Sequence, residues 1–260
     1  MDPVPSYGDV LALVTVTRTA ASPLRLPASL RTATVRPVRV VHVDVAGAPT
    51  IDGAEVVRLA EDVGRPAAVD RAVAGLDPSV GWVAIADPQV EWGPGALDVL
   101  LEAASRRPRA GVLAPRLRTP SGVDVQSGGE LPTLRTTLRG RIPAAPLPDG
   151  PVGWVDGTCL LVRRTAWDSV DGYDPRYPGS GSRPDPADVD LCDRLDRAGW
   201  LVAGVPAAVV TDHARGVLDP HGPHDLHGPV LETRDRSLRR YVHDRHGAPA
   251  RVLMALARRR

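Results

Sequence analysis

Trp154-Val-Asp-Gly-Thr-Cys-Leu-Leu-Val-Arg-Arg164, Asp171-Gly-Tyr-Asp-Pro-Arg-Tyr177 and Asp188-Val-Asp-Leu-Cys-Asp-Arg-Leu195 follow one another in the second half of the chain. The apolar run from Val155 to Val162 in the first segment predicts a buried strand. The last segment spaces its apolar residues as a helix does and predicts a helix from Asp188 to Ala198. The series is completed by the helix Arg164–Ser169, Ala198-Gly-Trp200, the strands Leu201–Val205 and Ala208–Thr211, and His213. This alternation indicates an α/β fold.

The first half of the chain repeats the alternation of strands and helices. Ala54–Leu59 fits a short strand or a helical turn. The expected strands are Val10–Val16, Val38–Val45, Trp82–Ala86 and Gly111–Ala114, and the expected helices are Ser22–Thr32, Pro66–Leu76 and Ala96–Ser105. Such spacing predicts a mostly parallel, doubly wound sheet with helices on both faces. Ligands of such sheets bind at the carboxyl ends of the strands, where Asp44 and Asp87 are expected.

The domain organisation is predicted to be simple. Residues 1–231 are predicted to form one domain. Residues 116–151 are rich in Gly, Pro, Thr and Arg, and they are predicted to cross the surface irregularly. Residues 232–260 are expected to form a basic C-terminal helix.

Composition excludes several classes of protein. The net charge of +1 gives no reason to expect a nucleic acid partner. Cys159 and Cys192 are too few for a zinc cluster, and both are expected to be small buried residues instead of a disulfide. An apolar run long enough to cross a bilayer and a secretory signal are both absent from the sequence. The cytoplasm is therefore the expected location.

The segments quoted first closely resemble the second half of the family 2 glycosyltransferases with the GT-A fold. That family has a strand with Gly and Arg, a Gly-Gly-Phe-Asp-type turn, a helix start of the form Glu-Asp-x-Asp-Leu, then Ala-Gly-Trp, a Pro and a His. Several ordered elements match across the stretch from Trp154 to His213, so the resemblance is specific.

The first half of the chain resembles the same family more loosely. Leu13-Val-Thr-Val-Thr17 is similar to the first strand of the nucleotide site, which implies a donor contact at Thr15. Trp82-Val-Ala-Ile-Ala-Asp-Pro-Gln-Val-Glu-Trp-Gly-Pro-Gly95 is similar to the metal-motif segment of bacterial cell-wall rhamnosyltransferases. The resemblance covers roughly residues 10 to 215, and it implies a nucleotide-binding half at about 10–115 and an acceptor half at about 152–215. It implies a dTDP- or UDP-sugar donor and a glycan or polyprenyl-linked acceptor.

The resemblance further implies a divalent metal, Mg²⁺ or Mn²⁺, because a departing nucleoside diphosphate develops negative charge that a cation neutralises. Asp87 and His213 occupy the positions of metal-side residues in that family. Gln89 stands where a second carboxylate is expected, and a neutral amide binds a hard dication more weakly. The alternative for His213 is a surface histidine beside Asp212.

Other family positions imply further site residues. Asp188 matches the proposed catalytic base, which takes the proton of the acceptor hydroxyl, although Ala187 replaces the preceding Glu. The alternative for Asp188 is a helix N-cap. Asp190 matches the acceptor side with a structural role, and Asp193 and Arg194 fit a solvated helix face. The same matches imply donor contacts at Asp44 and Asp70 and an acceptor-side turn at Asp156-Gly157. Asp70 stands where the family has Asn, and its added negative charge near a diphosphate would weaken binding unless a cation or Arg65 offsets it.

Two segments and two functions stay open at this point. The loop from Tyr177 to Ala187 fits a mobile lid or a disordered loop. The arginine-rich end fits an amphipathic helix on the inner face of an anionic membrane or a solvated helix on the domain. An active, inverting glycosyltransferase and a degenerate homologue that only binds its ligands both fit the motifs. A dinucleotide-binding enzyme does not fit, because the first strand is not followed by Gly-x-Gly-x-x-Gly.

Overall fold

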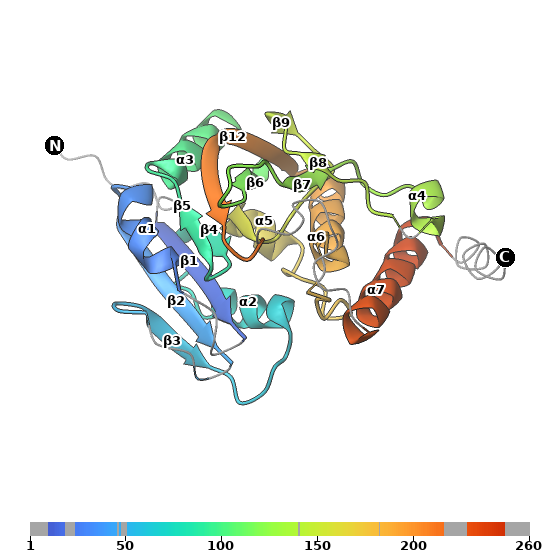
Figure 1. Cartoon of the computed structure of the whole chain (residues 1–260), viewed down its shortest axis with the longest axis horizontal. Helices are drawn as coiled ribbons and strands as arrows, with labels where there is room; N and C mark the ends of the chain where they lie inside the picture. Colours follow the sequence, from blue (N-terminus) through green and yellow to red (C-terminus); the bar gives the residue numbers. More distant parts are fainter. Residues whose placement is uncertain are drawn as a thin grey trace.

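The computed structural model describes residues 10–18, 24–45, 47, 51–139, 141–181, 183–215 and 228–247. In this part of the chain a nine-stranded sheet forms the centre of the molecule (Figure 1). Its strands are Val10–Thr17 (β1), Val38–Asp44 (β2), Glu55–Arg58 (β3), Val80–Ala86 (β4), Val90–Trp92 (β5), Ala110–Arg118 (β6), Gly150–Pro151 (β9), Cys159–Arg163 (β11) and Leu201–Asp212 (β12). The main path runs β3-β2-β1-β4-β11-β6-β12-β5, and β9 pairs with β12.

The direction of the strands sets where polar residues collect. β3, β2, β1 and β4 are parallel neighbours, and β6 is parallel to β12. Because β11 is antiparallel to both β4 and β6, these two strands run the same way as each other. The carboxyl ends of β2, β4 and β12 therefore lie at one edge of the sheet, and the antiparallel β11 begins there. The predicted, mostly parallel sheet is confirmed.

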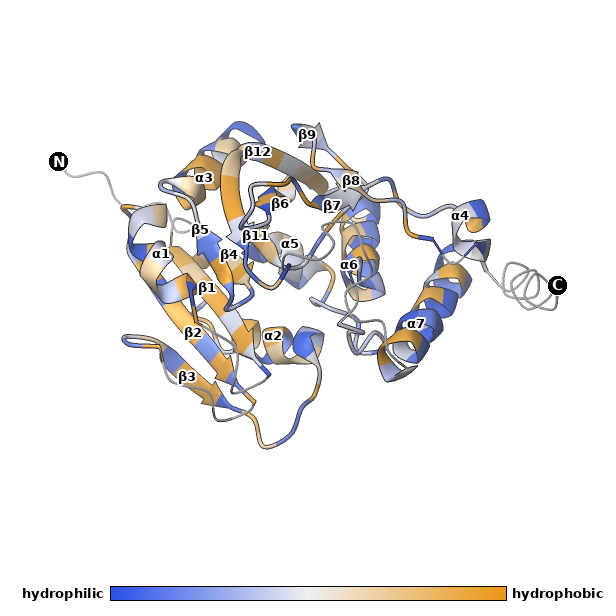
Figure 2. Ribbon diagram, in the orientation of Figure 1, coloured by the Kyte–Doolittle hydropathy of each residue, from blue (hydrophilic) through white to orange (hydrophobic). Residues whose placement is uncertain are grey.

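Helices cover both faces of the sheet, as the sequence predicts. One face packs on Leu26–Ala33 (α1) and Ala96–Arg106 (α3), and the other on Arg65–Ala74 (α2), Arg164–Ser169 (α5) and Pro186–Arg197 (α6). The strands alternate between two cores: Leu11 and Leu13 face α1 and α3, whereas Ala12 and Val14 face the other side. Figure 2 shows the orange, apolar strands at the centre of the molecule. Burial of apolar side chains on both faces stabilises such a sheet.

The segment between β6 and β10 is more regular than predicted. A second sheet has the order β10-β7-β8, with strands Trp154–Val155 (β10), Gln126–Gly129 (β7) and Ala145–Pro146 (β8). A short helix, Leu134–Leu138 (α4), lies between β7 and β8, with its N-cap hydroxyl at Thr133. The interpretation of residues 116–151 as an irregular excursion is therefore wrong. Its Gly and Pro content hid strands of only two to four residues.

Three predicted strands have different bounds. The single strand Val155–Val162 is two strands, β10 and β11, which belong to different sheets and are separated by Asp156, Gly157 and Thr158. Conversely, the two expected strands Leu201–Val205 and Ala208–Thr211 are one strand, β12, with a register shift between Val205 and Val209. The short β5 was not predicted. A backbone break inside an apolar run is not visible in the run's hydrophobicity.

The C-terminal helix, Gly228–His246 (α7), packs on α6 and α4. Leu238, Tyr241 and Val242 are buried there, so α7 lies on the domain, as the solvated-helix alternative predicts. Residues 248–260 lie outside the described residues. Among the described helices, none is long and apolar enough to cross a bilayer. Cys159 and Cys192 are buried and free, which confirms their structural interpretation.

Candidate active site

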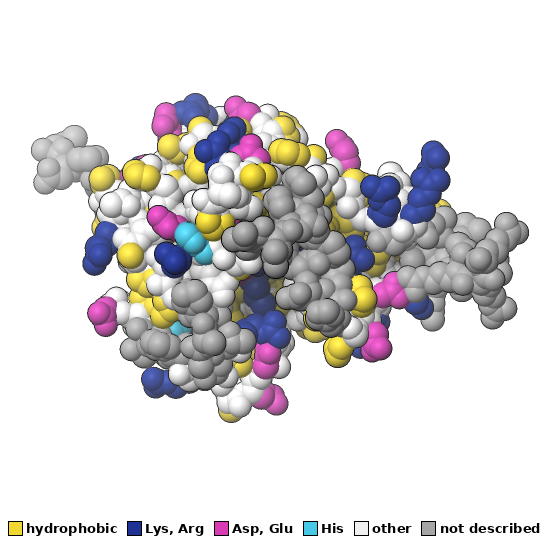
Figure 3. Space-filling view, in the orientation of Figure 1, with side chains coloured by type: hydrophobic (Ala, Val, Ile, Leu, Met, Phe, Trp, Pro, Cys, Tyr) yellow, Lys and Arg dark blue, Asp and Glu magenta, His cyan; other side chains and the backbone are white. Residues whose placement is uncertain are grey.

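A cleft opens at the carboxyl edge of the sheet, beside β4 and the start of β11. It is lined by Arg18, Arg65, Pro66, Asp87, Gly157, Thr158, Gly179, Gly181, Arg183, Asp185, Ala187 and Asp188. Figure 3 shows arginine side chains gathered near the centre of this face of the molecule. Three arginines and three aspartates are thus among the twelve residues that line the cleft.

Strand pairing brings the two halves of the sequence together at this cleft. β11 pairs with β4 in antiparallel register, with Cys159 opposite Ala86. The pairing continues one step beyond the strands, because the Asp87 amide donates to the Thr158 carbonyl at 2.8 Å. Asp87, at the end of β4, thus lies beside the turn Asp156-Gly157-Thr158, at the start of β11. Two sequence-predicted groups, the metal-side Asp87 and the acceptor-side turn, are neighbours.

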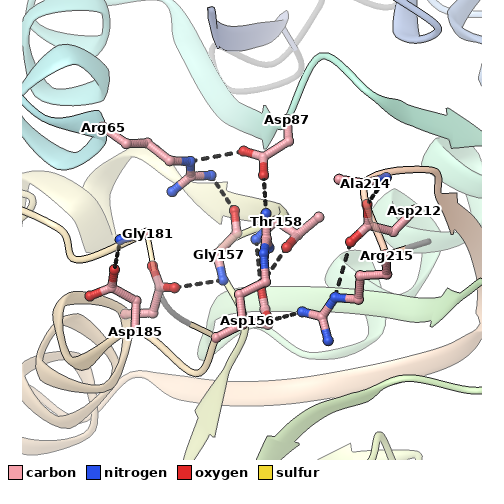
Figure 4. Close-up of polar contacts among 12 residues, drawn as sticks. Arg65, Asp87, Asp156, Gly157, Thr158, Gly181, Asp185, Asp212, Ala214 and Arg215 are labelled. Carbon is pink, nitrogen blue, oxygen red and sulfur yellow. Dashed lines mark hydrogen bonds and ion pairs between the residues drawn. The ribbon is translucent and has the colours of Figure 1, made fainter. Parts of the chain in front are cut away.

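Two guanidiniums hold the Asp87 carboxylate. Arg65 Nε donates to Asp87 Oδ1 at 2.9 Å, and Arg183 donates through Nη2 to the other oxygen, Oδ2 (Figure 4). Arg65 also donates to the Gly157 carbonyl and, at 3.4 Å, to the Tyr173 hydroxyl. Both oxygens of the predicted metal-side residue are therefore already bound to cations of the chain itself.

Asp156 is the centre of a second group, here called the Asp156 cluster: Asp156, Thr158, Arg183, Asp212 and Arg215 (Figure 4). Arg183 Nη1 donates to Asp156 Oδ1 at 2.9 Å, and Arg215 donates to Oδ2. Thr158 adds its amide at 2.8 Å and its hydroxyl. Although burial acts to raise the pKa of Asp156, the charges of Arg215 and Arg183 hold this pKa well below its usual range.

Asp188 lies on the other side of Gly157 and has different partners. Its Oδ2 accepts the Gly157 amide at 2.9 Å, and its Oδ1 accepts the Tyr173 hydroxyl at 2.9 Å. These three residues are here called the Asp188 pocket. Burial raises the pKa of Asp188 to about 7; Arg65 opposes the rise, and Asp185 and Asp156 add to it. A carboxyl that titrates near neutral pH is suited to general base catalysis.

The alternative role of Asp188 as a helix N-cap is wrong. α6 begins at Pro186, earlier than the predicted Asp188, and its N-cap is Asp185, whose Oδ1 accepts the Ala187 amide at 3.0 Å. Both oxygens of Asp188 point away from the start of its own helix, to Gly157 and Tyr173. The cap motif needs its acceptor one position before the helix, so the earlier helix start moves that role to Asp185.

Gly157 is required by the carboxylate next to it. A Cβ built on Gly157 would overlap the carboxylate atoms of Asp188. From the sequence, this glycine was predicted to let the backbone approach a sugar. In the structure, a glycine is required at this position by the neighbouring Asp188 carboxylate. Only a residue without a side chain lets the backbone N–H approach Asp188.

Tyr173 is presented by a tight turn in which Asp171 and Gly172 both have positive φ, 56° and 63°. Asp70, on α2, accepts the Tyr173 amide at 3.0 Å, and burial raises the pKa of Asp70 to about 6. The predicted donor-binding residue Asp70 thus anchors the turn that carries Tyr173. Its described contacts join the two halves of the chain.

His213, the second predicted metal-side residue, lies beside the segment that follows Asp87. Its amide donates to the Gln89 carbonyl at 3.4 Å, while its ring Nε2 lies 2.8 Å from Glu91 Oε2. Within the described residues, no group of three or more His, Cys, Asp or Glu is arranged to hold a metal. With Asp87 held by two guanidiniums and Gln89 neutral, the residues present do not fit a divalent cation at this position.

Thr15 and Asp44 lie on the neighbouring parallel strands β1 and β2, and Asp44 is the last residue of β2. Both are buried, and Arg58 Nε lies 3.8 Å from the Asp44 carboxylate. The Thr15 hydroxyl has no hydrogen-bond partner among the described residues. Thr17, further along β1, bonds His42 at 2.9 Å instead. The structure thus places Asp44 at the edge and Thr15 inside the sheet.

Asp190 and Asp193, further along α6, have structural contacts. Asp190 Oδ2 accepts Arg194 Nε at 2.8 Å, and Arg194 donates to the carbonyls of Val170 and Gly172, next to the turn of Tyr173. Asp193 is buried and paired with Arg197 and Arg245. The prediction of a solvated face for Asp193 is wrong, because α7 covers this part of α6.

The loop from Tyr177 to Ala187 packs on the start of α2. A Cβ on Gly64 would overlap the Pro178 carbonyl, and one on Gly179 would approach the Pro66 ring to 2.6 Å. Asp185 Oδ2 accepts the amides of Ser180, at 2.7 Å, and Gly181, at 3.1 Å. The described part of this loop is therefore ordered by its own contacts and brings Arg183 into the cleft.

Sequence reasoning did not identify several residues of the site. Arg183 and Arg215 are isolated arginines in segments without periodicity, and no spacing marks either of them. Tyr173 lies inside the quoted segment Asp171-Gly-Tyr-Asp, so its position was a usable signal. Asp185 precedes Pro186, a pair that is typical of a helix N-cap followed by proline at the first helical position.

Comparisons with known proteins agree with the architecture. The chain is 38% identical over 242 residues to an N-acetylglucosaminyl-diphospho-decaprenol L-rhamnosyltransferase of Mycobacterium tuberculosis, a match that covers 79% of this chain and 76% of that protein. Two strains of this organism provide the same match. No protein-family model matches the chain.

Solved structures with a similar fold are more distant in sequence. GalNAc-T7 with UDP, GalNAc and Mn²⁺ is 13% identical with a TM-score of 0.58. The chain covers only 48% of its length, with 90% of this chain aligned. A mannosyltransferase of Pyrobaculum calidifontis, in complex with GDP-Man and Mn²⁺, is 14% identical with a TM-score of 0.53 and matches 98% of this chain and 76% of its own. Such likeness shows the fold alone.

Proposed function

The chain belongs to the rhamnosyltransferase-like family 2 glycosyltransferases with the GT-A fold, and we propose that it transfers an L-rhamnosyl residue to a polyprenyl-diphosphate-linked N-acetylglucosamine. The proposed donor is a nucleoside diphosphate sugar, with dTDP- and UDP-sugars as the candidates. The acceptor class follows the mycobacterial relative, which matches 79% of this chain. A homologue without turnover is not favoured, because the cleft retains a buried carboxylate that titrates near neutral pH.

Asp188 is proposed as the catalytic base. It takes the proton from the acceptor hydroxyl, and the oxygen forms a bond to the anomeric carbon of the donor sugar. The bond from that carbon to the diphosphate breaks, and its electron pair leaves with the nucleoside diphosphate. Attack on the side opposite the leaving group inverts the configuration at that carbon.

The observation that carries this proposal is the environment of Asp188. The carboxyl is buried, lines the cleft, and has a pKa of about 7, so an appreciable fraction is ionised at neutral pH. The Gly157 amide and the Tyr173 hydroxyl fix its two oxygens. A fixed base with a pKa near the working pH combines the right protonation state with a useful driving force for proton transfer.

Incubation of the full chain with dTDP-L-rhamnose and a short polyprenyl-diphospho-N-acetylglucosamine tests the proposal. Mass spectrometry of the lipid product should show one added deoxyhexose, and no product should form when the acceptor lacks the N-acetylglucosamine. UDP- and GDP-sugars serve as alternative donors in parallel reactions. The absence of product with every donor would contradict the proposed activity.

A lipid-linked acceptor implies that the protein works at a membrane surface, and we propose peripheral attachment to the inner face through the arginine-rich end. The apolar residues Leu238, Tyr241 and Val242 of α7 are buried in the domain. Attraction to anionic lipid would therefore come from arginines of this end, including those of residues 248–260, which lie outside the described residues. Salt-dependent co-sedimentation with phosphatidylglycerol vesicles, compared in the full chain and in a chain ending at 247, tests this attachment.

A further inference from the structure

Where the family resemblance implies a divalent cation beside Asp87, the structure has two arginines of the chain itself. Arg65 and Arg183 each bind one oxygen of the Asp87 carboxylate, and Arg183 continues to Asp156. The side chain of Arg183 is 22% exposed and that of Arg65 is 21% exposed, so both guanidiniums lie in the wall of the cleft with restricted access to water. A carboxylate that meets two guanidiniums is not available as a strong ligand of a metal ion.

The balance of charges around Asp87 also opposes the binding of a metal ion. Asp87, Asp156 and Asp212 carry three negative charges, and Arg65, Arg183 and Arg215 carry three positive charges, all linked by ion pairs. A divalent cation added at Asp87 would meet guanidiniums on both carboxylate oxygens. In a site of low dielectric this repulsion opposes binding, unless the arginines leave.

Arg183 is held at this position by the packing of its loop. Gly64 and Gly179 allow the loop to contact the start of α2 closely, and Asp185 binds the amides of Ser180 and Gly181. The same Asp185 caps α6, the helix that carries Asp188. The loop that supplies the cation and the helix that supplies the proposed base are thus fixed by one carboxylate.

We infer that Arg65 and Arg183 take the role of a divalent cation: they bind the diphosphate of the donor, so that donor binding and transfer need no added metal. A guanidinium has five N–H donors in a planar fork, which allows one arginine to bind a carboxylate and a phosphate together. The N–H groups of Arg65 and Arg183 that are not bound to carboxylates then donate charge-assisted hydrogen bonds to the oxygens on which charge develops as the nucleoside diphosphate leaves. This inference rests on the proposed function, because that function brings a nucleoside diphosphate to the cleft.

Calorimetric titration of the full chain with dTDP and with UDP tests the inference, in EDTA and in excess MnCl₂. We expect the dissociation constant of the better nucleotide to agree within about twofold in the two buffers. Arg183→Gln should weaken this binding about 10- to 100-fold in EDTA, the size expected for a lost charge-assisted bond. Arg183→Lys keeps the positive charge but loses the planar fork of donors. Its dissociation constant should lie between those of the wild type and Arg183→Gln.

Arg176→Gln is the matched control, because Arg176 lies on the same connection but pairs with Asp174 and Asp244, away from the cleft. It should bind both nucleotides as the wild type does. Electron paramagnetic resonance of Mn²⁺ alone adds a readout that does not depend on any nucleotide. Wild-type protein should bind Mn²⁺ at least tenfold more weakly than Arg183→Gln, in which Asp87 loses one of its two guanidiniums.

Several results would overturn the inference. They are tight Mn²⁺ binding by the wild type, loss of nucleotide binding in EDTA, or stronger nucleotide binding by Arg183→Gln, which would make Arg183 a competitor of the donor. Rhamnosyl transfer that stops in EDTA would overturn the inference while the proposed function stands. Metal-independent nucleotide binding that needs Arg183, without transfer from any donor, would leave the inference in place and remove the proposed function.

Discussion

The Asp188 pocket and the Asp156 cluster lie on either side of Gly157, and their carboxylates differ in protonation although both are buried. Asp188 receives its hydrogen bonds from a backbone amide and a tyrosine hydroxyl, and burial raises its pKa to about 7. Asp156 receives bonds from two guanidiniums, and its pKa is held well below its usual range in spite of burial. Neutral donors leave a buried carboxyl able to exchange a proton, whereas cations fix it as an anion.

We propose that this difference gives the two carboxylates separate roles in the cleft. A group that must accept a proton and later release it needs a pKa near the working pH, which the Asp188 pocket provides. A permanently charged carboxylate is suited to binding cations, and Asp156 binds both Arg183 and Arg215. The following predictions test whether the two regions are as separate as their partners indicate.

The largest effect is expected for Asp188→Asn. Without a base, transfer should fall about 10²- to 10⁴-fold, because general base catalysis contributes on this scale. Nucleotide binding, measured by calorimetry, should stay within about threefold of the wild type. Asp168→Asn, an exposed carboxylate paired with Arg164 on α5, should keep full activity. Equal loss of nucleotide binding and of transfer would show that Asp188 acts in donor binding and not as the base.

Gly157→Ala should disturb the Asp188 pocket from its other side. The added methyl group would overlap the Asp188 carboxylate, so the base has to move from its position. Displacement of a catalytic group by about 1 Å costs on the order of 10²-fold in rate. Gly75→Ala is the control, because a Cβ there has only ordinary contacts, the nearest at 3.6 Å. Unchanged transfer by Gly157→Ala would show that the contact with Asp188 is not needed.

Asp156→Asn should act on stability. It leaves the buried Arg215 with Asp212 and Arg183 with Asp87 as their remaining anionic partners. Loss of one member of a buried ion pair costs about 3 to 5 kcal/mol. Urea unfolding followed by tryptophan fluorescence measures this change in the free energy of unfolding. Asp124→Asn, in an exposed pair with Arg118, should cost less than about 1 kcal/mol. Comparable losses in the two variants would contradict the assigned role of Asp156.

Tyr173→Phe should shift the pH dependence of transfer. The base works when it is deprotonated, so the rate should fall as the pH falls through about 7. The Tyr173 hydroxyl stabilises the charged carboxylate, and its removal should move this fall to higher pH and lower the rate at pH 7 about 3- to 10-fold. Tyr177→Phe, whose hydroxyl contacts Asp244, should leave the profile unchanged. If the pH profile of Tyr173→Phe overlays that of the wild type, the Tyr173 hydroxyl does not influence the pKa of the base.

The smallest effect is a slope in stability with pH. The folded-state pKa of Asp188 is above its unfolded value, so its contribution is full below about pH 4 and is lost as the pH rises through about 7. Asp156 has the opposite sign, and its contribution is lost only in acid. Between pH 5 and 8, Asp188→Asn should therefore flatten the wild-type decline, by on the order of 1 kcal/mol per pH unit at most. Equal slopes would contradict the burial of an ionisable Asp188.

The sequence was informative where chemistry repeats at regular spacing. The apolar runs placed β1, β2, β4 and β6 within a few residues of their observed bounds, apart from the carboxyl end of β6. The predicted strand ends placed Asp44 and Asp87 at the carboxyl edge of the sheet, where the structure has them. The series from Trp154 to His213 led to the predictions for Asp188 and for the turn at Gly157, which the structure brings together in the cleft. Hydrophobic period and strand order are local properties, and each can be read from neighbouring residues.

The sequence alone did not reveal the partners of those residues. Asp87 as a metal-side group and Asp70 as a donor contact were predictions from single positions. The structure shows that Arg183 and Arg65 meet Asp87, and that Asp70 accepts the amide of Tyr173. These pairs join residues that are 22 to 103 positions apart in the chain. No local pattern encodes such a pair.

By itself, the sequence determined the α/β architecture and the family, because these depend on residue type and spacing, and it led to the prediction that Asp188 is the base. Only the tertiary structure decided the protonation of each carboxylate and the cation beside it. The reason is that a pKa depends on burial and on the charge of the nearest partner, and both are set by contacts between distant segments.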